Sequence, residues 1–237
     1  MAKTINLKET SSINGNKWKH LFLGIIFFVL TLILLFLVAA PLVATGRLVL
    51  GVLAFCMSVA FSALSNQQYN LFNRCSMIEH SCEVTNHLLS GLPDSYTIYN
   101  NVFVNEAKLD YIVVGNNGIF IVVNRTVKGV IHCNDSEKHW LVDKTGRDGG
   151  SYTSEIPNPM RQLRWQIHTL SKYLKDNGVN IWIDGCVYFS NSDSDLLNKP
   201  SNCFSLDKDV VSFIMNYVPK KKLNPQMINQ AKDCLEV

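Results

Sequence analysis

Two long apolar runs near the N-terminus constrain this chain more than any other feature. Residues 21–46 carry no charged side chain, and a second apolar run, residues 48–64, follows after the lone Arg47. A bilayer core about 30 Å thick is crossed by roughly 20 helical residues, and a helix satisfies its own backbone polar groups. The short connection therefore predicts a helical hairpin that crosses a membrane twice and returns the chain to the side of its N-terminus.

The charges that flank the hairpin predict its orientation. The tip carries only Arg47, whereas the first twenty residues carry one glutamate and four lysines, Lys3, Lys8, Lys17 and Lys19. Positively charged flanks favour the cytoplasmic side, so we expect the N-terminus and the soluble domain to be cytoplasmic at the inner (cytoplasmic) membrane. A cleavable signal peptide is the alternative, but its apolar region would be shorter and no second span would follow.

The remainder of the chain is long enough for one domain with its own core. We expect a cytoplasmic tail at 1–20, the transmembrane hairpin at 21–65, a domain at 66–190, and a C-terminal extension at 191–237 that ends in a helix. Acidic and basic residues nearly balance beyond the hairpin, which argues against strong nonspecific binding of nucleic acid but allows a local basic patch. The seven scattered cysteines show no zinc-ligand spacing, so free thiols are expected and no metal or other cofactor is implied.

Periodicity and turn residues predict the order of elements in this domain. The expected helices are 77–89 and 158–174, and the expected strands are 96–104, 109–114, 119–123, 129–133, 140–142 and 180–189. The segment Gly115-Asn-Asn-Gly118 is typical of a tight hairpin, because Asn and Gly tolerate positive φ.

This hairpin predicts a register. If Asn116 and Asn117 form its two-residue loop, facing residue numbers sum to 233, so Asp110 lies opposite Val123 and Lys108 lies opposite Arg125. All four side chains then project from one face of the sheet. Two like charges across a strand pair repel unless an acid or an anion lies between them, so this face is either an anion site or a structural ion-pair cluster.

Three segments resemble one family. They are Gly91-Leu-Pro-Asp-Ser-Tyr96, the strand pair from Leu109 to Val123, and Asn158-Pro-Met-Arg-Gln162. Together they resemble the nuclease-related domain, NERD, a branch of the PD-(D/E)xK nuclease-like fold, over about residues 76–190. The resemblance implies an α/β fold: a restriction-endonuclease-like α-β-β-β-α-β domain that follows the transmembrane helical hairpin.

Carried over residue by residue, the resemblance implies a catalytic site that is incomplete. Asp110 matches the family's metal-binding acid and Gln162 its glutamine, but the Glu-x-Lys motif falls on Val123-Asn124-Arg125. The family's Gly-Glu pair aligns with Ser81-Cys82, and only a one-residue shift recovers Glu83.

These replacements alter the chemistry that the site can support. Mg²⁺ in a phosphodiesterase is usually held by two or more carboxylates, and Val123 cannot serve as one. Arg125 stays protonated near neutral pH and is a poor substitute for a lysine that moves or orients a proton. Lys128 is close in sequence, but three residues further on it points to the other face of a regular strand.

Two hypotheses of function follow. The first is a membrane-anchored, catalytically degenerate NERD module, not an enzyme, in which Asp110, Arg125 and Gln162 are vestigial. It would bind nucleic acid or another anion through Lys108, Arg125, Lys128, Arg161 and Arg164, or bind a membrane protein partner or a second copy of itself. The alternative is an active Mg²⁺-dependent nuclease with displaced ligands, in which Asp110 and Glu83 hold the metal.

Overall fold

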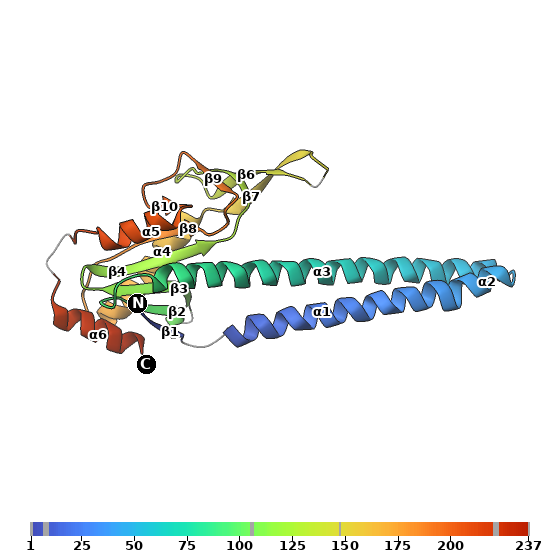
Figure 1. Ribbon diagram of the computed structural model, residues 1–237, viewed down its shortest axis with the longest axis horizontal. Helices are drawn as coiled ribbons and strands as arrows, with labels where there is room; N and C mark the ends of the chain where they lie inside the picture. The colour runs from blue at the N-terminus through green and yellow to red at the C-terminus, as the bar shows by residue number, and fades with distance from the viewer. Residues whose placement is uncertain (1, 7–9, 105–106, 147, 220–222, 237) are drawn as a thin grey trace. The chain divides into compact units, whose positions relative to one another are not determined.

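The computed structural model describes residues 2–6, 10–104, 107–146, 148–219 and 223–236 (Figure 1). Contacts divide the chain into two units: residues 10–80, and a domain made of residues 1–9 together with residues 81–237. Lys8, one of the four N-terminal lysines, lies outside the described residues.

The first unit is a helical hairpin. α1 (Thr10–Ile33) continues into a π-helical turn, η1 (Leu34–Ala39), and α2 (Ala40–Ala44), and α3 (Leu48–Ser90) returns alongside. The Ser65 hydroxyl donates to the carbonyl of Gly24 at 3.0 Å, and the rings of Phe27 and Phe61 lie 5.9 Å apart. The predicted pair of apolar helices joined by a short turn is therefore confirmed, and both helices are long and apolar enough to cross a membrane.

α3 differs from the sequence expectation in one respect. The apolar run, the polar stretch after it and the helix expected at 77–89 are not separate elements but one helix of 43 residues. Nothing between Leu64 and Ser90 interrupts it, because this stretch contains neither proline nor glycine. The last turns of this helix, from Ser81 onward, belong to the domain.

The domain is built on a six-stranded sheet with the order β1-β2-β3-β4-β8-β10. Its strands are β1 (Lys3–Asn6), β2 (Thr97–Val104), β3 (Ala107–Gly115), β4 (Gly118–Arg125), β8 (Ile183–Phe189) and β10 (Cys203–Phe204). β2, β3 and β4 form an antiparallel meander, and β8 pairs parallel to β4 after the crossover helix α4 (Pro159–Asp176). The expected α-β-β-β-α-β order is confirmed.

β1 was not expected from the sequence. Residues 3–6, assigned above to a tail, pair parallel with β2, with Lys3 opposite Thr97 and Asn6 opposite Asn100. No local pattern in the sequence predicts β1, because its partner strand lies more than ninety residues away. Since the hairpin separates β1 from β2 in sequence, this pairing requires the N-terminus and the domain to share one compartment.

A second, smaller sheet takes three of its strands from the segment between β4 and α4 and its fourth from the segment after β8. Its order is β7-β6-β5-β9, formed by β5 (Gly129–His132), β6 (His139–Thr145), β7 (Ser151–Pro157) and β9 (Ser194–Leu197). β6 and β7 form an extended arm (Figure 1). The strands expected at 129–133 and 140–142 are present, but they belong to this sheet rather than to the main one.

Helices cover both faces of the main sheet. Leu163 and Leu170 of α4 and Ile228 of α6 (Pro225–Leu235) pack on the face that carries Ile112 and Ile121. The end of α3 and α5 (Asp207–Met215) pack on the opposite face, which carries Val113, Phe120 and Val122. The unbroken runs of buried residues along β3 and β4 thus reflect burial on both faces of the sheet.

Candidate functional site

The β3–β4 hairpin sets the geometry of the site. Tyr111 pairs with Val122, Val114 with Ile119, and Gly115 with Gly118, so facing residue numbers sum to 233 as predicted. Alternation along the strands then places Asp110 and Arg125 on the face that α4 covers. Both side chains are partly buried there.

Asp110 is held in surroundings that disfavour its charge. Its Oδ2 atom is buried and has no hydrogen-bond partner in the described part of the chain. Burial raises the pKa of this carboxyl, while the charge of Arg125, the backbone N–H of Asn124 and the charge of Lys108 oppose the rise. Burial is the larger effect, so Asp110 is less acidic than an exposed aspartate.

Arg125 is the residue at which the resemblance noted in the sequence leads one to expect a lysine. Its Nη1 donates to the carbonyl of Asn124 at 3.0 Å. Burial lowers the pKa of this guanidinium, and the nearby Asp110 carboxylate partly restores it. The guanidinium of Arg125 therefore compensates the negative charge of Asp110. The same guanidinium donates a hydrogen bond to a backbone carbonyl of its own strand.

Gln166 is the site residue that sequence reasoning missed. Its side chain is 0% exposed, and neither of its amide atoms makes a hydrogen bond of good geometry within the described residues. The amide nevertheless lies near enough to Asp110 to lower the pKa of that carboxyl. Gln162, the glutamine carried over from the family, lies one turn earlier and is half-buried. The available signal was a polar residue at a core position between Leu163 and Leu170.

The remaining family positions supply no second acid beside Asp110. Val123 is 0% exposed and belongs to the core on the α4 face. Glu83 is exposed on α3 and makes contacts of its own. Within the residues that the structure describes, no three His, Cys, Asp or Glu side chains gather as a metal-binding group. Among the described residues, Asp110 thus lies near the cations Arg125 and Lys108 and not within a group of metal ligands.

A polar network fixes α3 against the other face of β4. The Asn124 amide donates to the hydroxyl of Ser81 at 2.7 Å, and Ser81 and Ser190 share a hydrogen bond of 2.6 Å. The hydroxyl of Tyr111 donates to the carbonyl of Cys82 at 3.3 Å. Ser81 and Cys82 therefore attach the helix to the sheet.

The predicted anion-binding cations lie in different places. Lys108 is exposed at the start of β3 and acts on Asp110 through its charge. Lys128, between β4 and β5, pairs with Asp193 at 2.8 Å, and Arg164 pairs with Asp135 at 2.9 Å. Arg161 is exposed on α4. The structure brings together Asp110, Arg125 and Lys108, but not the other cations.

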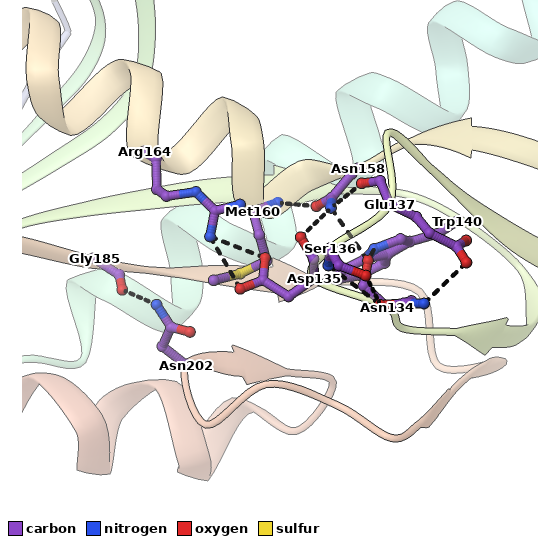
Figure 2. A network of polar contacts seen from close by, with 10 residues as sticks. All are labelled: Asn134, Asp135, Ser136, Glu137, Trp140, Asn158, Met160, Arg164, Gly185 and Asn202. Atoms are coloured by element: carbon purple, nitrogen blue, oxygen red, sulfur yellow. Dashed lines mark hydrogen bonds and ion pairs between the residues drawn. The ribbon is translucent and has the colours of Figure 1, made fainter.

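The Asn158-Pro159 motif has a structural role (Figure 2). The Asn158 side chain accepts from the N–H of Met160 at 2.9 Å and so caps α4. Its amide also donates to the carbonyl of Glu137 at 2.7 Å, and the indole N–H of Trp140 donates to the carbonyl of Asn134 at 2.7 Å. This buried asparagine thereby fixes the loop between β5 and β6 against the start of α4.

Comparisons with known proteins identify one relationship. Residues 79–190 match the family described as the nuclease-related domain, NERD. The match begins in the last turns of α3 and continues through β8, and it therefore includes Asp110, Arg125 and Gln166. No curated protein and no solved structure matches the chain.

Proposed function

We propose, from the match of residues 79–190 to the nuclease-related domain family, that the chain is a membrane-anchored module that binds nucleic acid without hydrolysing it. The observation that carries this proposal is the position of Arg125. A metal-dependent phosphodiesterase places a divalent cation beside its acid, whereas here a guanidinium compensates Asp110.

The substitution at Val123 supports the same conclusion. A divalent cation bound by Asp110 would need further oxygen ligands, and the side chain at position 123 is apolar and fully buried. The site therefore conserves the architecture of a nuclease without its metal chemistry.

The hairpin supplies the membrane anchor in this proposal. Large side chains on its outer surface are exposed, among them Phe22 at 64%, Leu37 at 72% and Val49 at 76%. A surface of this kind is covered by lipid rather than by water. The lysines near the N-terminus then retain that end, and with it the domain, in the cytoplasm.

The outer face of α4 is the surface that we assign to the nucleic acid. Arg161, His168, Lys172 and Lys175 recur there at helical spacing and are exposed, and no acidic residue lies between positions 161 and 175 of the helix. Arg164, on the same helix, is paired with Asp135 and is not counted among these cations. Trp165 lies in the middle of this row and is 51% exposed. Cations that follow a phosphate backbone and an aromatic face that stacks a base are the usual components of a single-strand site.

One experiment tests hydrolysis. The full chain, purified in detergent micelles, is incubated with supercoiled DNA, single-stranded DNA and RNA, with Mg²⁺, with Mn²⁺ or with EDTA. We expect no metal-dependent cleavage above the level of an Asp110→Ala control. Cleavage that requires metal and is abolished by Asp110→Ala would reject this proposal and establish the alternative, a Mg²⁺-dependent nuclease.

A second experiment tests binding. The anisotropy of a labelled single-stranded oligonucleotide is followed as the salt concentration is raised, for the wild type and for Arg161→Ala combined with Lys172→Ala. Each lost phosphate contact reduces the slope of log K against log salt by about 0.7, so the double variant should lose about 1.4. Lys208→Ala, an exposed lysine on α5, is the matched control. Equal slopes for all three proteins would exclude α4 as the binding face.

A further inference from the structure

A cavity of about 190 Å³ lies at the edge of the main sheet where β4 and β8 begin. Four separate segments line it: the β3–β4 turn, the residues before β8, the residues after α5 and the start of α6. The lining residues that matter to the argument are Asn117, Asn180, Trp182, Tyr217, Asn224 and Met227. None of them belongs to the Asp110 site.

The walls of the cavity are held in place by interactions of their own. Asn117 accepts from the hydroxyl of Tyr96 at 3.0 Å and donates to the carbonyl of Ile214 at 2.6 Å. The ring of Tyr217 meets Phe120 edge-on, with centroids 5.1 Å apart. A cavity with fixed walls loses little conformational entropy when a ligand enters, which favours binding.

The lining combines an aromatic face with uncharged polar groups. Trp182 is 55% exposed, so much of its indole surface is open, and Met227 lies in the same cavity. The Asn180 side chain makes no hydrogen bond among the described residues, and Asn224 uses its Oδ1 to cap α6, which leaves its amide N–H groups. The lining residues carry no charge. Together they offer a stacking surface with both hydrogen-bond donors and acceptors.

We infer that this cavity binds a purine base. A flat heteroaromatic ring stacks on an exposed indole, and its edge presents the alternating donors and acceptors that asparagine amides match. The volume is below the roughly 300 Å³ at which sites for drug-sized ligands begin, so the recognised group is of about ten heavy atoms. Because the lining is uncharged, affinity comes from the base and not from a phosphate group.

Calorimetric titration of the full chain in micelles tests this inference, with adenosine, adenosine monophosphate, cytidine and glucose as probes. The variants are Trp182→Ala, Trp182→Phe and Asn180→Ala. The matched control is Tyr152→Ala, an aromatic residue of similar exposure, 54%, on the β6–β7 arm away from the cavity.

We expect adenosine and its monophosphate to bind within about threefold of one another, and more tightly than cytidine or glucose, because the larger base stacks over more area. Trp182→Ala should weaken the binding of adenosine by at least about fivefold and Trp182→Phe should weaken it by less, whereas Tyr152→Ala should leave it unchanged. No saturation below about 5 mM adenosine, a preference for glucose, or equal effects of Trp182→Ala and Tyr152→Ala would overturn the inference. These outcomes do not depend on hydrolysis or on oligonucleotide binding by α4.

Discussion

The interaction between Asp110 and Arg125 can be measured by a double-mutant cycle. Arg125→Met replaces the guanidinium with an apolar chain of similar length, and Asp110→Asn removes the carboxylate charge while retaining its shape. The two charges act on one another, and a pair of unit charges about 4 Å apart in an effective dielectric of about 20 has a Coulomb energy of about 4 kcal/mol, which is an upper bound here. Both groups retain some contact with solvent, which screens them, so we expect a coupling free energy of about 1 to 2 kcal/mol.

The coupling should depend on pH with a defined sign. The folded-state pKa of Asp110 is raised by burial, so the folded protein holds this proton more tightly than the unfolded chain. Stability from this group is therefore present below the ordinary aspartate pKa and is lost as pH rises through the folded pKa. Arg125→Met removes the strongest opposing charge and raises that pKa further. Its destabilisation should be small near pH 4 and largest near pH 8.

Urea denaturation of the micelle-solubilised protein supplies the four free energies of unfolding. Trp140 is 0% exposed, whereas Trp18, Trp165 and Trp182 are all at least half exposed, so the change in fluorescence reports mainly on the domain core. A coupling below about 0.5 kcal/mol, or one that is the same at both pH values, would refute the view that Arg125 compensates the charge of Asp110.

Three further predictions concern the structure around the site. Asn158→Ala should lower the free energy of unfolding, measured by urea denaturation, by about 2 kcal/mol, because the α4 cap and the bonds to the β5–β6 loop are lost together. The control Asn177→Ala, at the exposed end of α4, should lower it by less than half of that amount. Gln166→Leu should raise the thermal midpoint slightly or leave it unchanged, because both amide atoms of Gln166 are buried without good partners; a fall of several degrees would show that the amide is bonded in solution. Deletion of residues 2–6 should abolish hydrogen-exchange protection along the outer edge of β2, and unchanged protection there would contradict the β1–β2 pairing.

The sequence predicted most where the signal is local. The register of the β3–β4 hairpin follows from two Asn and two Gly residues, and it places Asp110 and Arg125 correctly on one face. The two apolar helices and α4 follow in the same way from composition and helical period. These elements are determined by residues close to them in sequence, so pattern reasoning reaches them.

The parts that were not predicted depend on distant contacts. The strands β5 and β6 were recognised as strands, but alternation does not reveal which sheet a strand joins. Gln166 was missed because Gln162, one helical turn earlier, fits the family motif, and both lie toward the same side of α4. Which of the two reaches Asp110 depends on the depth at which α4 packs on the sheet, and that depth is a tertiary property.

The replacements at positions 123 and 125 make physical sense as a pair. A glutamate at position 123 would place a second carboxylate beside Asp110, and without a bound cation the two charges would repel in a poorly solvated site. Val123 removes that repulsion and contributes to the core, while Arg125 supplies a permanent cation that a titratable lysine would not guarantee under burial. In the function that we propose, the domain folds without metal, and the β3–β4 face keeps its shape at any cation concentration. A site organised in this way suits a module that must remain folded and available for binding, and it removes the requirement for metal on which hydrolysis would depend.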